Sequence, residues 1–364
     1  MSLTARKPAN RLSLDYLAEA ARFGSYQGPI VDVHTHINGE ERAAAIYKRA
    51  RDAYGIKLTY SMSRLESVPY LTDLFEGTIR FIAVPNYMGD DRQHNHGPGF
   101  LERIEKFHEL GSRIVKFWAA PRGRDYAEEA GEPDLLDLES PWRIKAAEMA
   151  VERGMMLMVH VADPDTWFAT KYTDRIKYGS KLDQYAPLER MLERFPVPWL
   201  AAHMGGWPED LEFLDGLLER HPHLHFDTSA TKWMVRELSK HSRADLRAFL
   251  TKWKGRILFG SDIVSMDEHL NDESGAFDVG AQASGEQDAF DLYASRYWAL
   301  RTLWETEYEG ESPIADPDLQ MVEPDKYGEL DAPPLRGHAL PADILRSLYV
   351  EAAAGFFGEG ELGN

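Results

Sequence analysis

The sequence predicts an α/β protein with the (β/α)8 TIM-barrel fold, and three observations favour this fold class. Short apolar runs rich in β-branched residues alternate with amphipathic segments of helical period, which is the pattern of parallel βα units. Eight such strand-like runs occur, and eight is the number of strands in this barrel. The chain has 364 residues, and α/β barrels often exceed about 250 residues as one domain.

Each predicted strand is a short apolar run. The eight strands are PIVDVHTHI (29–37), IKLTYS (56–61), IRFIAVPN (79–86), SRIVKFWAA (112–120), MMLMVHVA (155–162), PWLAAHMGG (198–206), HLHFDTSA (223–230) and RILFGSD (256–262). Helical periodicity is clearest at 41–55, 141–154, 208–221 and 242–255. Three of these four segments end on glycine, which is the usual residue just after a helix.

Outside the barrel, residues 1–28 are expected to form an N-terminal helical arm and residues 341–364 a C-terminal helix that completes the barrel of residues 29–264. Residues 265–340 are expected to form an insertion at the barrel mouth, because they contain no second alternating core pattern. Their aromatic helix (288–308) is too apolar to be freely solvated, so it should bury against the barrel or against a second subunit. The acidic, proline-rich stretch 309–337 is expected to wrap the surface.

Composition narrows the class of function. The net charge of -19 disfavours nucleic acid or an anionic membrane as partner, so we expect a small-molecule enzyme. No apolar stretch is long enough to span a bilayer, and the N-terminal segment lacks the apolar core of a signal peptide; we expect a cytoplasmic protein and a homo-oligomer, with a dimer favoured. Because the chain has no cysteine, any metal must be held by imidazole, carboxylate, water or a modified lysine, which points to Zn, Mn or Fe.

Two histidines one residue apart, His34 and His36, end the first predicted strand. Residues two apart on a strand share a face, so both imidazoles and Asp32 should lie on the same side and point into the barrel mouth. A single HxH motif is weak, because His94 and His96 form another in a predicted loop. His221 and His223 lie at the opposite end of a strand, and His225 lies within that strand as an expected buried, satisfied histidine.

Three other predicted strands also end in a residue whose side chain can bind a metal ion. The fifth ends in His160, the sixth in His203 and the eighth in Asp262. Barrel enzymes place their chemistry at the carboxyl ends of the strands, so these side chains should converge on one rim. Neutral imidazoles and a carboxylate suit zinc, which lowers the pKa of bound water to about 7. Asp262 could contact the metal and accept a hydrogen bond from that water, while an unligated His203 could transfer protons.

Five motifs, VDVHTHI, VKFW, MVHVAD, AHMGG and LFGSD, together carry a family resemblance. In their order and on these strands the chain resembles the amidohydrolase superfamily, and most closely the amidohydrolase-related branch that includes aminocarboxymuconate-semialdehyde decarboxylase. The resemblance implies one divalent metal, with His34, His36, His160 and Asp262 as ligands and His203 as the non-ligand acid/base. Two departures concern the substrate class: Ile263-Val264-Ser265 stand where an aromatic residue and a proline are usual, and Glu351 replaces the usual asparagine of the last helix.

Several residues near the strand ends are candidates for substrate binding. Lys116 shares a strand face with Trp118 and could orient a substrate carboxylate or, if carboxylated, bridge a second metal. Since the branch that the chain resembles is mononuclear, we expect one metal and no bridge. Four polar residues could bind an acidic substrate: Asp227 at the end of the seventh strand, Arg236 after it, and Arg122 and Arg124 after the fourth strand. Three aromatic residues that follow strand ends could wall the pocket or pack in the core: Trp118, Trp167 and Trp207.

Three hypotheses remain open on the sequence. The first is a metal-dependent hydrolase of a small amide, ester or lactone that uses a metal-activated water. The second is a metal-dependent non-oxidative decarboxylase with the same ligands and with His203 protonating carbon. The third is a barrel that only binds a ligand, and the complete set of His34, His36, His160, His203 and Asp262 counts against it.

Overall fold

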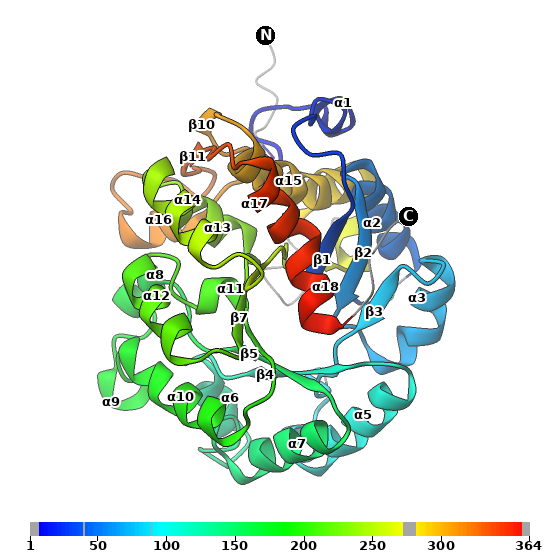
Figure 1. Cartoon of the computed structure of the whole chain (residues 1–364), viewed down its shortest axis with the longest axis vertical. Helices are drawn as coiled ribbons and strands as arrows, with labels where there is room; N and C mark the ends of the chain where they lie inside the picture. The colour runs from blue at the N-terminus through cyan, green and yellow to red at the C-terminus, as the bar shows by residue number, and fades with distance from the viewer. Residues whose placement is uncertain (1–6, 39–40, 88, 272–281, 359–364) are drawn as a thin grey trace. The chain divides into compact units, whose positions relative to one another are not determined.

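The computed structural model describes residues 7–38, 41–87, 89–271 and 282–358. The chain divides into two compact units, which are coloured by position along the chain in Figure 1. The first unit contains Met1–Thr59, Pro69–Ile79 and Thr228–Asn364, and the second contains Tyr60–Val68 and Arg80–Asp227.

The first unit is organised around β1 (Ile30–Ile37), which lies between β2 (Ile56–Ser61) and β9 (Ile263–Ser265). The ladder between β1 and β9 is parallel and pairs Thr35 with Ile263. The eighth predicted strand is shorter than expected, because β8 covers only Ile257–Leu258. Asp262 has φ +60°, a left-handed conformation that cannot continue a strand, so the chain turns there before it forms β9.

The helices of the first unit surround these strands. They are α1 (Tyr16–Ala20), α2 (Glu41–Ala53), α3 (Val68–Leu74), α13 (Thr231–Leu238), α14 (Arg243–Lys252), α15 (Glu286–Glu305), α16 (Pro317–Val322), α17 (Ala342–Arg346) and α18 (Ala352–Phe357). The predicted final helix is therefore divided, with a π-helical turn over Ser347–Glu351 between α17 and α18. The stretch 309–337 carries an antiparallel pair, β10 (Glu309–Glu311) with β11 (Pro334–Arg336), in addition to α16.

The aromatic helix α15 is buried along most of its length, as the sequence predicts. It packs against α2 and α13 within the first unit (Figure 1). The hydroxyl of its Tyr297 lies 2.8 Å from the hydroxyl of Tyr47 on α2. The apolar surface of this helix is thus covered by the same chain. The acidic segment before α15 falls partly on residues 272–281, which lie outside the described residues.

The second unit is built on four parallel strands in the order β4 (Ile114–Trp118), β5 (Met156–His160), β6 (Trp199–Ala201) and β7 (Leu224–Asp227). The register pairs Trp118 with His160, so both side chains leave the sheet at its carboxyl edge. Ala83, which follows β3 (Ile79–Phe81), forms an isolated parallel bridge with Val115 on β4. The helices are α4 (Arg92–His96), α5 (Pro98–Glu109), α6 (Gly123–Glu129), α7 (Pro141–Glu152), α8 (Asp165–Thr170), α9 (Arg175–Tyr178), α10 (Tyr185–Arg194), α11 (Ala202–Gly205) and α12 (Leu211–Arg220).

The α/β class is confirmed, because β1 to β8 follow one another in the (β/α)8 order with a helix between each pair. The pairs β1–β9, β4–β5, β5–β6 and β6–β7 are all parallel. The sixth predicted strand ends early at Ala201, since His203 and Met204 take positive φ values of 58° and 50°. The predicted loop around His94 and His96 is wrong. These residues form α4, because the Asp91 side chain caps the backbone N–H of His94.

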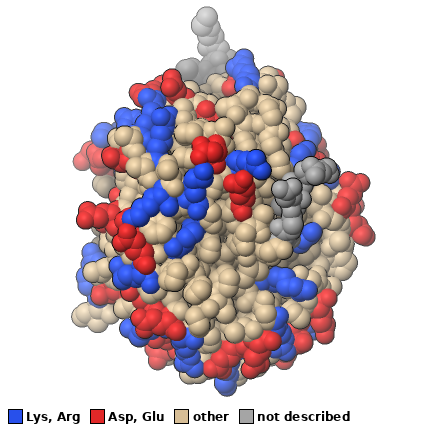
Figure 2. Space-filling model, viewed as in Figure 1, with Lys and Arg blue, Asp and Glu red and all other residues tan. Residues whose placement is uncertain are grey.

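Figure 2 shows acidic and basic side chains interspersed over the visible face. Among the residues described, no helix combines the length and apolarity that crossing a membrane requires.

The stability of the protein should fall on acidification through His338. This side chain is fully buried, and burial lowers its pKa from 6.5 to about 4. Between these two pH values the unfolded chain binds a proton that the folded chain does not, so the free energy of unfolding should drop by up to about 3 kcal/mol as pH falls. Urea unfolding at several pH values measures the drop. His338→Gln should reduce it and the exposed His223→Gln should not; equal pH dependence in both variants would contradict this assignment.

Candidate functional site

The first unit brings together three of the four predicted metal ligands. The Nε2 atom of His34 lies 3.3 Å and the Nε2 atom of His36 lies 3.2 Å from Oδ1 of Asp262. All three residues offer ligand atoms within 4.8 Å of one another. His34 is buried, whereas His36 and Asp262 are partly exposed. The spacing is that of donors that face a common point, which a divalent cation could occupy.

Hydrogen bonds of the backbone and of the Asp32 side chain hold this cluster in place. The Asp262 N–H donates to the His34 carbonyl at 2.8 Å, which ties the end of β1 to the turn after β8. Asp32 accepts from the Ser261 hydroxyl at 2.6 Å and from the Ser261 N–H at 3.0 Å. The Tyr297 hydroxyl donates to the same carboxylate at 2.9 Å. Burial raises the pKa of Asp32 to about 6, and these hydrogen bonds oppose the rise. Asp32 thus fixes the residue that precedes Asp262.

Ser229 sets the orientation of the His34 ring. Its Oγ lies 2.9 Å from Nδ1 of His34, which leaves Nε2 to face Asp262. Metal-binding histidines usually have such a partner on the ring nitrogen that does not bind the metal. Ser229 follows β7, and Ala230 after it has φ +67°. Sequence reasoning missed this serine, although its place just beyond a strand end was a usable signal.

We expect Ser229→Ala to weaken zinc binding by about 10- to 100-fold, because the His34 ring would lose the partner that orients it. Competition with a chromogenic chelator measures the apparent Kd. Ser295→Ala is the matched control, since Ser295 is also buried in the first unit but its hydroxyl donates to the Leu292 carbonyl on α15. Equal affinity in both variants would show that Ser229 does not position a ligand.

The second unit contains the other two predicted histidines as an adjacent pair. His160 Nδ1 lies 3.2 Å from His203 Nε2, and the two rings meet edge to face at 4.6 Å. The other nitrogen of His160 lies 2.9 Å from Oδ1 of Asp163, which accepts a 2.6 Å hydrogen bond from Tyr172 on its second oxygen. The carboxylate therefore favours the tautomer in which Nε2 of His160 carries the proton. Nδ1 is then unprotonated, so it accepts from Nε2 of His203 and has a free lone pair in the absence of that hydrogen bond. Asp163 was another residue that sequence reasoning missed.

His203 is held in an uncommon backbone conformation. Its φ is +58°, and its N–H donates to Oδ1 of Asp227 at 3.0 Å. Gly205 follows at φ +62°, where a Cβ would lie 2.6 Å from the Phe226 ring, so this position requires glycine. Left-handed non-glycine residues concentrate at functional sites because the surrounding structure must enforce them. Asp227, predicted to bind substrate, is fully buried and supports His203 through the backbone.

Lys116 and Trp118 lie on β4 in the second unit. Lys116 is buried within the strand, and the Trp118 ring meets the His160 ring edge to face at 6.5 Å. Trp207, another predicted pocket residue, stacks on Tyr185 at 5.7 Å. Trp118 is thus the aromatic candidate whose ring meets a histidine that was predicted as a metal ligand. The roles of Lys116 and Trp118 in substrate binding remain predictions.

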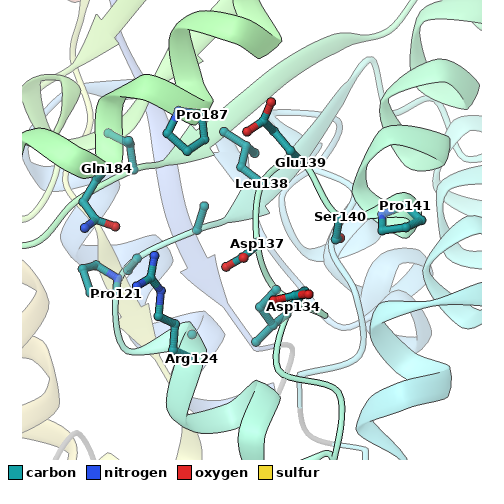
Figure 3. A pocket seen from close by; sticks show the side chains of 15 residues that line it. Pro121, Arg124, Asp134, Asp137, Leu138, Glu139, Ser140, Pro141, Gln184 and Pro187 are labelled. Atoms are coloured by element: carbon teal, nitrogen blue, oxygen red, sulfur yellow. The ribbon is translucent and has the colours of Figure 1, made fainter. Parts of the chain in front are cut away.

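A cavity of about 360 Å³ lies in the second unit beyond the carboxyl ends of β4 and β5, where Ala119, Ala120 and Val161 line it. Figure 3 shows Arg124, Asp137 and Gln184 around this space. Burial raises the pKa of Asp137, and the charge of Arg124 opposes the rise. Of the two arginines predicted after the fourth strand, Arg124 is one of the residues that line the cavity. Arg122 packs its guanidinium over the Tyr126 ring at 5.6 Å.

Arg236 lies in a buried ionic cluster of the first unit. Its guanidinium pairs with Glu237 at 2.7 Å, with Asp318 at 3.1 Å and with Asp316. Arg236, Glu237 and Asp316 are each at most 3% exposed. These carboxylates join α13 to the segment that carries α16. The prediction that Arg236 binds substrate would require them to be displaced.

We expect Arg236→Met to lower the free energy of unfolding by about 3–5 kcal/mol, because it leaves buried carboxylates without their counter-charge. Urea unfolding at pH 7 measures the change. Lys254→Met is the control, since Lys254 pairs with the exposed Asp343 and should cost less than about 1 kcal/mol. A stable Arg236→Met variant with impaired substrate binding would favour the substrate role instead.

Comparisons with known proteins give similarity at the level of solved structures. No protein-family profile matches the chain. No curated protein matches it either. An uncharacterized TIM-barrel protein from Bordetella bronchiseptica is 12% identical with a TM-score of 0.44, over 81% of this chain and 95% of that one. A zinc-bound amidohydrolase from Burkholderia multivorans is 13% identical with a TM-score of 0.42, over 91% and 99%. A 2,6-dihydroxybenzoate decarboxylase is 12% identical with a TM-score of 0.42, over 73% and 99%. These sequence identities and TM-scores are too low for the reaction of any of these proteins to be assigned to this chain.

Proposed function

We propose that this protein is a metal-dependent hydrolase of the amidohydrolase type that acts on a small amide, ester or lactone. The observation that carries the proposal is the convergence of His34 Nε2 and His36 Nε2 on one carboxylate oxygen of Asp262. The family resemblance of the sequence adds His160 as a fourth ligand and His203 as the acid/base.

The donor set fits one divalent metal. Two imidazoles and a carboxylate, with His160 as a further imidazole, suit Zn²⁺, and Mn²⁺ or Fe²⁺ are the alternatives. When bound at such a site, the ion lowers the pKa of a coordinated water to about 7 and polarises a carbonyl oxygen. The tautomer that Asp163 favours leaves Nδ1 of His160 as a lone-pair donor, which is what ligation requires.

The other groups would handle protons and position the substrate. Asp262 is partly exposed and can accept a proton from the attacking water through its carboxylate. His203 can then donate a proton from Nε2 to the leaving group. Asp227 holds the His203 backbone, and so it would keep the ring in place while the proton moves. Trp118 would pack the substrate against the His160 edge.

Metal analysis of the purified protein, followed by a substrate screen, tests the proposal. Lactones, amides, esters and aromatic carboxylic acids would be tested with and without added Zn²⁺, and hydrolysis and CO2 release would be scored separately. Metal-dependent hydrolysis supports the proposal. Metal-dependent CO2 release without hydrolysis would replace it with decarboxylation by the same residues. A metal-free protein that turns over none of these compounds would overturn both.

A further inference from the structure

A buried arginine in the second unit lacks a counter-charge. Arg143, in the first turn of α7, is 1% exposed. Its Nη2 atom donates to the Trp118 carbonyl at a long 3.4 Å. Within the described residues, Nε and Nη1 have no hydrogen-bond partner, and no carboxylate pairs with this guanidinium. Such a group is costly to bury unless an anion accompanies it.

The surroundings of Arg143 are aromatic. The guanidinium carbon lies 5.8 Å from the ring centre of Phe100 and 5.5 Å from that of Phe117. Both rings are fully buried, and they meet edge to face at 6.1 Å. Cation–π contacts stabilise the positive charge in part, but they leave the N–H groups without acceptors.

A second buried polar group lies near this arginine. His96 is 6% exposed, and its Nδ1 has no hydrogen-bond partner among the described residues. Burial, and next the positive charge of Arg143, lowers the pKa of His96 to about 3. The ring is therefore neutral at pH 7 and carries one N–H. The Tyr87 ring lies 5.5 Å from it.

We propose that Arg143 and His96 form a binding site for the carboxylate of a small molecule with an apolar skeleton. Arg143 supplies one full positive charge and His96 a neutral donor, which match a carboxylate better than a phosphate dianion. The aromatic walls match an apolar remainder. The carboxylate oxygens of the ligand would accept charge-assisted hydrogen bonds from the guanidinium N–H groups, which otherwise lack acceptors.

Trp118 links this site to the histidine pair of the same unit. Trp118 is the last residue of β4, and its carbonyl accepts from Arg143 while its ring packs against the ring of His160. A ligand held at Arg143 would therefore lie at the carboxyl end of β4, next to β5, the strand that ends in the predicted metal ligand His160. On this basis, and resting on the proposed function, the carboxylate is one that the substrate keeps through hydrolysis.

Binding of 4-fluorobenzoate, followed by ¹⁹F NMR, tests the site. The protein would be studied as purified and after metal removal, because a carboxylate can also bind a metal. The neutral analogue 4-fluorobenzyl alcohol serves as the ligand control. We expect the acid to bind at least about 10-fold more tightly than the alcohol in both preparations, and Arg143→Met to lose about 10- to 100-fold in affinity for the acid. The exposed Arg194→Met, which removes the same charge from the same unit, should bind like the wild type.

Equal binding of the acid and the alcohol by the wild-type protein would overturn the proposal, and this comparison needs no variant to fold. A folded Arg143→Met variant with unchanged affinity would also overturn it. Displacement of 4-fluorobenzoate by an equal concentration of inorganic phosphate would contradict the preference for a carboxylate. Acid binding that survives metal removal supports the site even if the substrate screen finds no hydrolysis, so the two proposals can fail separately.

Discussion

The His34→Ala, His36→Ala double variant is expected to lose its metal, whereas the wild-type protein should contain close to one transition metal ion per chain. The two imidazoles supply two of the three ligand atoms that the first unit places around one point. The remaining Asp262, even with His160 as the fourth predicted ligand, would hold an ion weakly. Inductively coupled plasma mass spectrometry after dialysis against metal-free buffer measures the metal content directly, without any knowledge of the substrate.

The control for this experiment is His94→Ala, which removes an exposed histidine from another HxH motif and should keep the full metal content. Circular dichroism of the double variant shows whether the fold survives, since His36 is partly exposed and His34 is buried. Metal retention close to the wild-type level in a folded double variant would refute the assignment of the site to these residues.

The strands, and the cluster of His34, His36 and Asp262, could be predicted from the sequence for simple physical reasons. Apolar runs with β-branched residues identify strands from local composition alone. The two-residue period of a strand then places His34 and His36 on one face, and the structure brings Asp262 to them. The ligand role of these residues, and of His160, remains a prediction.

What the sequence could not provide were the turns and the supporting hydrogen bonds. Asp262 and His203 adopt positive φ although neither is glycine, the residue that usually marks this conformation. The early ends of their strands could therefore not be predicted from residue type. Ser229 supports His34 from a position 195 residues away. Such contacts depend on tertiary structure, and a serine after a strand is too common to be selected in advance.

Charged residues were the least predictable class. Arg236 follows the seventh strand and was therefore a candidate for substrate binding, but its partners are carboxylates from α13, from the N-cap of α16 and from α16 itself. Arg143 lies within an ordinary amphipathic helix pattern, and its burial without a counter-charge appears only when α7 packs on β4. Whether an arginine is free to bind a ligand is decided by packing, which a periodic pattern does not reveal.

The variant His203→Ala is expected to keep its metal and to lose about 10²- to 10⁴-fold in kcat on whatever substrate the screen identifies. The resemblance places His203 outside the ligand set, and its ring lies 3.2 Å from His160 with its backbone fixed by Asp227. Acid/base transfer and ligation are therefore separable in this proposal, and two measurements, metal content and kcat, report on them independently.

His223→Ala is the matched control, because His223 is exposed and lies just before β7 at the opposite end of the strand from Asp227. It should leave both quantities unchanged. His203→Gln, which keeps a polar side chain of similar reach but cannot carry a proton, should lose as much kcat as the alanine variant if proton transfer is the role of this residue. Near-full activity in His203→Gln would indicate that the side chain orients the substrate instead, and loss of metal in both variants would make His203 a ligand.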